Sequence, residues 1–186
     1  MAWIDSVYDR TNLDLTNLKS IINKVKAGGY KSLSASDKAY WLADLVKGAL
    51  NFTDLNRIEN NMKELQEFLI TLGYDVDIET KTDWTRNDLI YQDDITRLMN
   101  NYTELSNKAL LHNKDIKFIL TSNPSYWSDI PSYYTWEDLG EDSDWYKVIH
   151  DILINKMITN FLLDIHHVNG LEEALEIIKN GIGVVS

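Results

Sequence analysis

Apolar residues recur every three or four positions over much of the chain, which is the spacing that places them on one face of an α-helix. The clearest example is at residues 53–72, just before Gly73, and its apolar positions are Leu55, Ile58, Met62, Leu65, Leu69 and Leu72. The same spacing recurs at residues 93–111 and, more briefly, at residues 12–27, 34–46, 143–169 and 171–180. The pattern therefore predicts about six helices, with a break at Gly170 between the last two.

Capping residues support several of these boundaries. Thr11 or Asn12 is the predicted cap of the first helix. Ser34 and Asp37 have the spacing of a capping box at the start of the second helix, and Thr53 is the predicted cap of the third.

Residues 74–80 follow a different pattern, in which apolar and acidic residues alternate. Tyr74, Val76 and Ile78 are the apolar members. Alternation predicts a short strand or an extended arm, and a lone strand needs a partner for its backbone. These three residues are therefore predicted to contact a partner, either within this chain or on another subunit.

A second copy of one helix is visible when the chain is compared with itself at a shift of 40 residues. The shift pairs polar as well as apolar residues: Asp54 with Asp94, Arg57 with Arg97, Asn61 with Asn101, Glu64 with Glu104, and Leu65 with Leu105. Helical periodicity requires only the apolar matches, so the polar ones favour a true repeat over chance similarity. A weaker third copy is predicted to begin at residues 134–138. Repeats of this kind are typical of stacked or bundled helical units.

These patterns predict a mainly α fold, with helices packed as antiparallel hairpins or a bundle. Residues 1–122 form the predicted helical domain that contains the two related units. Residues 123–133 hold both prolines and form a predicted loop, and residues 134–186 form a C-terminal helical segment.

Composition narrows the function more than the fold. The chain has 186 residues and a formal net charge of −11, without a basic run, so no nucleic-acid partner is predicted. The absence of cysteine excludes disulfides, thiolate metal sites and cysteine nucleophiles. Residues 1–5 have no signal-peptide character, and no apolar run is long enough to span a bilayer, so no membrane partner is predicted either.

Candidate chemical groups are sparse. The adjacent His166 and His167 point about 100° apart on a helix and cannot chelate one metal ion together. An acidic cluster at residues 137–144 lacks the order of a calcium loop, which leaves only adventitious calcium binding. Carboxylate pairs for a cell-wall hydrolase can be nominated at Glu59 and Asp54 or at Asp138 and Glu141, but any acidic helical protein supplies such pairs. The sequence therefore predicts no enzyme, no cofactor and no metal site.

Aromatic residues crowd the proline-containing loop. They are Tyr126, Trp127, Tyr133, Tyr134 and Trp136. One interpretation is that they cover the end of the helical bundle. The other is a docking surface, because tyrosine and tryptophan are enriched in binding hot spots.

Several short motifs resemble those of a known family. They lie at residues 9–11 (DRT), 40–42 (YWL), 45–59 (LVKGALNFTDLNRIE) and 81–85 (KTDWT). Together they are similar to small virion structural proteins encoded among the tail genes of phages and prophages of Gram-positive bacteria. The resemblance covers residues 3–153 and implies a tail or baseplate component without catalytic residues.

The sequence hypothesis is thus a non-enzymatic virion protein, assembled in the bacterial cytoplasm, that associates with itself and with other virion structural proteins. Closed rings are the usual symmetry of such components, so a homo-oligomer is expected. The alternatives are a head or neck accessory protein, an intracellular helical interaction or regulatory module, and the cell-wall hydrolase.

Overall fold

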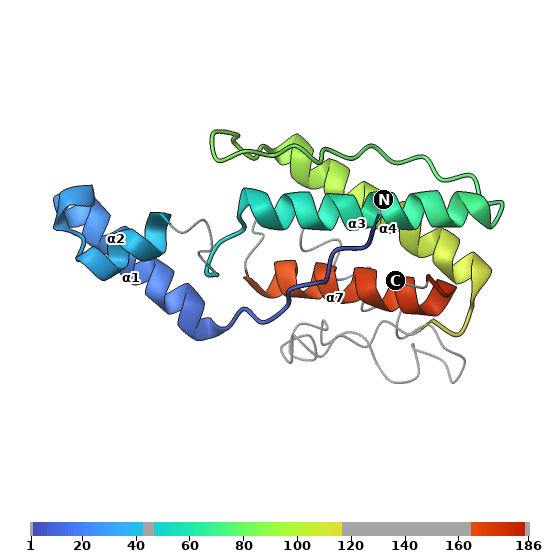
Figure 1. Ribbon diagram of the computed structural model, residues 1–186, viewed down its shortest axis with the longest axis horizontal. Helices are drawn as coiled ribbons and strands as arrows, with labels where there is room; N and C mark the ends of the chain where they lie inside the picture. Colours follow the sequence, from blue (N-terminus) through green and yellow to red (C-terminus); the bar gives the residue numbers. More distant parts are fainter. Residues whose placement is uncertain (1, 43–46, 117–164, 185–186) are drawn as a thin grey trace, which may run out of the picture.

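The computed structural model describes residues 2–42, 47–116 and 165–184, and in this part of the chain the protein is mainly helical (Figure 1). The helices, in order, are α1 (Asn12–Gly28), the short 3-10 helix η1 (Tyr30–Ser32), α2 (Ala35–Leu42), α3 (Phe52–Thr71), α4 (Gln92–His112) and α7 (Ile165–Ile182). The predicted mainly α fold is confirmed, and none of the described residues forms a strand.

The first and third helices begin close to their predicted caps. Thr11 caps α1, and its side chain accepts a hydrogen bond from the Asp14 N–H. The cap of α3 is Asn51 instead of Thr53, because Asp54 at the third helical position accepts the Asn51 N–H at 3.0 Å. A capping box needs this spacing, and Asn51 and Asp54 provide it.

The C-terminal helix corrects one predicted boundary. A break at Gly170 was expected, but α7 runs continuously through it, and Gly170 is buried. Glycine inside a helix costs about 1 kcal/mol relative to alanine. Burial of apolar neighbours on the same helix outweighs this cost, and these neighbours are Val168, Leu171, Ala174 and Leu175.

The three long helices α3, α4 and α7 pack together and form the core. Of the two predicted arrangements, antiparallel hairpins or a bundle, these helices form a bundle, and all three run in the same direction (Figure 1). Near their starts, Arg97 of α4 contacts Glu59 of α3, while near their ends Asn113 donates a hydrogen bond to the Gly181 carbonyl at 2.9 Å. A parallel arrangement is reached because residues 74–91 return along the helices in extended form.

The core is apolar and continuous across the three helices. Its fully buried large side chains are Tyr102, Ile58, Met62, Leu65, Leu69, Leu98, Met99, Leu105, Leu171 and Leu175. Helix α7 therefore belongs to the same core as the two repeated helices.

Helices α1 and α2 lie beside this core and cross each other, and we call this pair the hairpin (Figure 1). Lys24 of α1 pairs with Asp37 of α2 at 2.8 Å, and the hairpin buries mainly Leu18, Ile21 and Leu33.

Two extended segments complete the described structure. The first arm, residues 3–11, runs over the core and leads into α1, whereas the second arm, residues 74–85, runs from the end of α3 toward the start of α4 (Figure 1). The turn into the second arm is made by Gly73, whose φ of 89° favours glycine. Of the two predictions for residues 74–80, the extended arm is the one observed.

Candidate functional site

The predicted contact residues of the second arm lie against this chain's own core. Val76 is 5% exposed, and Tyr74 and Ile78 are partly buried against the same cluster. The Tyr74 ring meets that of His112 edge-on at 5.8 Å. The apolar residues of this arm thus face the core and the acidic residues face outward, although the arm is not part of a sheet. That these residues dock to another protein stays a prediction.

The first arm is held in the groove between α3 and α7 by two buried side chains of α7. Asn169 accepts a hydrogen bond from the Arg10 N–H at 3.4 Å and donates one to the Arg10 carbonyl at 2.9 Å. One helical turn later, Glu172 accepts the Val7 N–H at 2.5 Å. We call Asn169 and Glu172 the first clamp.

The second arm is held in the groove between α3 and α4 in the same way. Asn56 of α3 accepts the Trp84 N–H at 2.8 Å and donates to the Trp84 carbonyl at 2.9 Å. One turn later, Glu59 accepts the Lys81 N–H at 2.5 Å. We call Asn56 and Glu59 the second clamp.

A further asparagine forms two hydrogen bonds with the backbone of each arm, closer to the start of the arm. Asn61 accepts the Ile4 N–H at 2.9 Å and donates to the Ile4 carbonyl at 2.8 Å. Asn101 accepts the Glu79 N–H at 3.3 Å and donates to its carbonyl at 2.6 Å. Asn61 and Asn101 are partners in the 40-residue repeat, so the repeat relates residues with the same structural task.

The two grooves are therefore two copies of one arrangement. Val7 and Arg10 of the first arm correspond to Lys81 and Trp84 of the second arm. Helix α7 corresponds to α3 as the helix that carries the clamp, and α3 corresponds to α4 as the helix that carries the further asparagine. Because α3 takes part in both grooves, it holds one arm with Asn61 and the other with Asn56 and Glu59.

Four charged side chains meet at the end of the first groove. Arg10 lies 2.6 Å from Asp54 and 3.6 Å from Glu172, and Arg57 lies 2.8 Å from Asp54 and 2.5 Å from Glu172. Arg57 is the most exposed of the four side chains, at 13%. Burial alone would lower the pKa of the Arg57 guanidinium, but its hydrogen bonds and attraction to Glu172 and Asp54 raise that pKa above its ordinary value. Two arginines and two carboxylates thus form a buried cluster without net charge, which we call the charge quartet.

The second groove has a simpler centre. Fully buried Glu59 forms a two-pronged ion pair with Arg97 and accepts the Trp84 indole N–H at 2.8 Å. The hydrogen bond from Arg97 to Glu59 raises the pKa of the guanidinium despite its partial burial. Asp94, the repeat partner of Asp54, stays 3.8 Å from Arg97 with a side chain that is 25% exposed.

Each arm ends in the same threonine–aspartate turn. The Thr11 N–H and hydroxyl donate to Asp14 at 2.8 and 2.7 Å, and the Thr85 N–H and hydroxyl donate to Asp88 at 2.6 and 2.9 Å. In the first arm this turn opens α1 directly, whereas in the second it precedes α4 by several residues.

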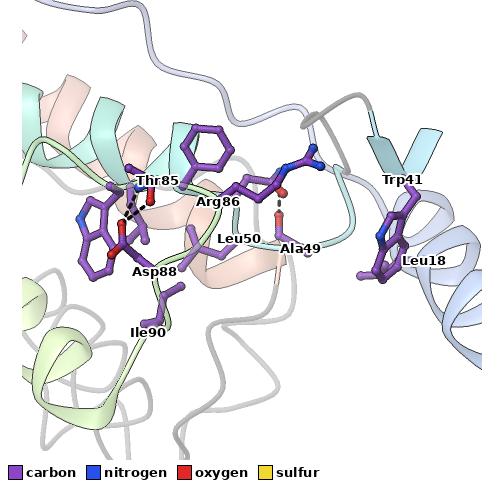
Figure 2. Close-up of a pocket in the computed structure, with 12 residues that line it drawn as sticks. Leu18, Trp41, Ala49, Leu50, Thr85, Arg86, Asp88 and Ile90 are labelled. Carbon is purple, nitrogen blue, oxygen red and sulfur yellow. Dashed lines mark hydrogen bonds between the residues drawn. The ribbon is translucent and has the colours of Figure 1, made fainter. Parts of the chain in front are cut away.

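A cleft of about 300 Å³ opens where the second arm faces the hairpin (Figure 2). Figure 2 shows Leu18 and Trp41 of the hairpin on one side and Leu50 and Ile90 of the core on the other. Arg86 extends between the two sides and donates to the Leu42 carbonyl at 3.1 Å. The lining thus combines apolar walls with the Arg86 guanidinium, the Asp88 carboxylate and the polar residues Asn51 and Thr85.

Exposed apolar residues adjoin this cleft in sequence. Leu42 follows Trp41 and is 54% exposed, while Leu89 and Tyr91 flank Ile90 and are 69% and 62% exposed. A contiguous exposed apolar patch next to a cleft is typical of a contact with another protein.

The carboxylates nominated for hydrolysis have structural partners. Asp54 belongs to the charge quartet, and Glu59 is paired with Arg97 and covered by Trp84, so neither faces a sugar-sized cleft. Asp138 and Glu141 lie outside the described residues.

Other candidates divide between the described and undescribed parts of the chain. The described residues contain no group of three histidine or acidic side chains placed to hold a metal ion, and none of their helices combines the length and apolarity of a membrane span. The side chains of His166 and His167 and the residues at 137–144 are outside the described part. So are the third repeat copy and the aromatic candidates Tyr126, Trp127, Tyr133, Tyr134 and Trp136.

Sequence reasoning missed the clamp on α7 and the buried arginine of the first arm. A detectable signal exists: Asn56 and Glu59 have the same i, i+3 spacing as Asn169 and Glu172, 113 residues later. Likewise, the pattern Asp-x-Thr-x-x-Asp occurs at residues 9–14 and 83–88. The 40-residue comparison could not show either relation because both lie at other shifts.

Comparison with known proteins adds no relative to this geometry, since no family model, curated protein or solved structure matches the chain.

Proposed function

We propose that this protein is a non-enzymatic structural component of a phage virion, in the tail or baseplate, that works by self-association and by docking to neighbouring virion proteins. The observation that carries the proposal is the pair of arms, each held by helix side chains that bind its backbone. Extended segments seated in helix grooves are a general means of joining protein units, because the contact is long and its register is fixed residue by residue.

The surface around the cleft supports the same proposal. Trp41 and Leu42 leave apolar area exposed beside Arg86, and Leu89 and Tyr91, on either side of the cleft residue Ile90 in the sequence, are also exposed. This combination resembles the apolar core and polar rim of protein interfaces. The motif resemblance noted above connects these physical features to virions in particular.

Size-exclusion chromatography with light scattering is the first test, with the intact chain at several concentrations. The proposal predicts a mass of at least two chains that persists on dilution, since virion components act as closed assemblies. A strict monomer of 21.5 kDa at all concentrations would count against it and favour the interaction-module alternative.

The second test is location. An antibody against the protein is applied to particles of the phage that encodes it, and the particles are viewed by negative-stain electron microscopy. Label at the tail tip or baseplate is the expected result. Label at the head or neck would assign the protein to that alternative, and particles without label would contradict a virion function.

A further inference from the structure

We propose that the first arm exchanges between copies of this chain, so that residues 3–11 of one copy occupy the α3–α7 groove of another. The inference deepens the proposed function, on which it rests, by naming the partner in self-association as a second copy and the joining element as this arm.

The first observation is that arm docking does not depend on how the arm is tethered. The second arm follows α3 after the turn at Gly73, whereas the first arm leads into the α1–α2 hairpin. Both make the same backbone hydrogen bonds to an asparagine and a glutamate one helical turn apart. The groove therefore recognises the arm itself, and an arm from another copy satisfies it equally well.

The second observation is that the described helices offer no vacant clamp. On α4 the positions equivalent to Asn56 and Glu59 are Thr96 and Met99, and on α7 the position equivalent to Asn61 is Ala174. A second copy cannot extend the array by adding a helix at either end. Association through these grooves therefore requires one arm to replace another.

The third observation concerns the body that would move with the arm. The hairpin lies to one side of the core and has its own buried residues, Leu18, Ile21 and Leu33 (Figure 1). Exposed apolar residues occur both in the first turn of α1, where Leu13 is 67% exposed, and along the arm, where Ile4 and Tyr8 are each 42% exposed. A neighbouring copy in an exchanged assembly would cover these residues.

The charge quartet provides a selective test, because its neutrality depends on the arm. Arg10 is the one cation that the arm contributes, and Asp54, Arg57 and Glu172 come from the groove. Arg10→Met leaves an excess buried negative charge, and Glu172→Gln leaves an excess positive charge. When the two variant chains exchange arms, one groove regains the complete quartet. The other combines both substitutions and is also neutral.

The experiment mixes full-length Arg10→Met with ¹⁵N-labelled Glu172→Gln, after joint unfolding and refolding, and records native mass spectra. Exchange predicts that the mixed dimer exceeds either homodimer by about tenfold, equivalent to about 1.4 kcal/mol. The mixture should also unfold at a higher temperature than either variant alone. Mixed dimers at or below the statistical level would overturn the proposal.

Two controls make the result specific. The double variant Arg10→Met/Glu172→Gln in one chain restores neutrality in every groove, and its folding shows that the substitutions are tolerated. Arg97→Met mixed with Glu59→Gln removes an equivalent pair, but both residues lie on core helices, so no preference for mixed dimers is expected.

A second experiment leaves the charge quartet intact. Trp3, which packs against Lys179 of α7, is replaced by the photoreactive benzoylphenylalanine in equal amounts of ¹⁴N and ¹⁵N chains that are refolded together. Exchange predicts cross-links between light arms and heavy α7 peptides. Assemblies that contain only light–light and heavy–heavy cross-links would overturn arm exchange while leaving self-association intact. A monomer that contains only light–light or heavy–heavy cross-links would contradict both arm exchange and the proposed self-association.

Discussion

The two arm grooves share a backbone arrangement and differ in one buried side chain. At the position where the first arm places Arg10, the second places Trp84, and the two residues are 6% and 3% exposed. Their neighbours differ accordingly: Asp54 lies 2.6 Å from Arg10, whereas its repeat partner Asp94 stays farther out, 3.8 Å from Arg97. The groove that receives the arginine thus contains two buried carboxylates, Asp54 and Glu172, and the groove that receives the tryptophan contains one, Glu59.

This difference separates recognition of the arm from the stability it provides. Hydrogen bonds to the backbone from Asn169 or Asn56 are indifferent to the arm's side chains and fix the register. The buried side chain then sets the charge: with arginine the groove needs two carboxylates, and with tryptophan it needs only Glu59, which Arg97 neutralises. Removal of one partner from a buried ion pair is far more costly than the pair is stabilising.

The largest effect is expected when the second arm's residue is placed in the first groove. Arg10→Trp leaves Asp54 and Glu172 with only Arg57, so one buried carboxylate lacks a counter-charge. We expect a loss of about 3–5 kcal/mol in the free energy of unfolding, measured by urea denaturation. Adding Glu172→Gln should recover part of the loss, and a loss below about 1 kcal/mol would show that the quartet is not what holds the arm.

The reverse substitution should cost less. Trp84→Arg brings a second guanidinium into the other groove, but Asp94 lies near enough to turn inward and neutralise it, as Asp54 does for Arg10. We expect a loss of about 2 kcal/mol, mainly from the missing indole.

A double-mutant cycle isolates the contribution of Asp94. Asp94→Asn alone should change stability by less than about 1 kcal/mol, because the side chain is partly exposed. The same substitution in the Trp84→Arg background should cost clearly more, and additive effects would refute the latent pairing.

Much of the helical framework could be predicted from the sequence, since it depends on local signals. The apolar seams of α3 and α4 and the capping threonine of α1 require only near neighbours in sequence. The continuity of α7 through Gly170 could not be read in this way, because burial against α3 and α4 decides it. The parallel direction of the core helices likewise depends on the second arm, which runs back along the helices in extended form. No local sequence pattern indicates in which direction such a segment runs.

The grooves were less accessible to sequence reasoning. Asn61 and Asn101 were found as repeat partners, but the repeat gave no reason to expect that they bind arm backbone. Arg10 was seen only within a motif, since its carboxylate partners lie 44 and 162 residues away in the chain. Long-range ion pairs of this kind leave no periodic signal.

A smaller contrast concerns the asparagines of the two clamps. Asn169 is 1% exposed, whereas Asn56 is partly exposed. Asn169→Ala leaves the backbone groups of Arg10 without partners away from water, so we expect a loss of about 2 kcal/mol, against about 1 kcal/mol for Asn56→Ala, where water can reach the freed groups. Hydrogen exchange of the Arg10 and Trp84 amides in the two variants should report which arm has loosened. Equal losses of stability would contradict the expectation that the more buried asparagine contributes more.

The smallest expected effect involves the two threonine–aspartate turns and appears only in acid. A hydrogen bond from the Thr11 side chain lowers the pKa of Asp14, and hydrogen bonds from the Thr85 backbone and hydroxyl lower the pKa of Asp88. Since each folded-state pKa is below the ordinary value of about 3.9, both groups stabilise the protein fully above that value. This contribution is lost as the pH falls through the lowered pKa.

Urea midpoints measured from pH 6 to pH 2.5 should therefore fall less steeply at the acid end for Asp14→Asn and Asp88→Asn than for the unmodified chain. The two turns have the same hydrogen bonds but different continuations: Asp14 is in the first turn of α1, while Asp88 precedes α4 by several residues. The positive end of the α1 dipole favours the Asp14 carboxylate, so its substitution should flatten the acid limb more than that of Asp88. If the urea midpoints of the two variants fall equally at the acid end, the turn alone, without the helix that follows it, determines the stabilisation.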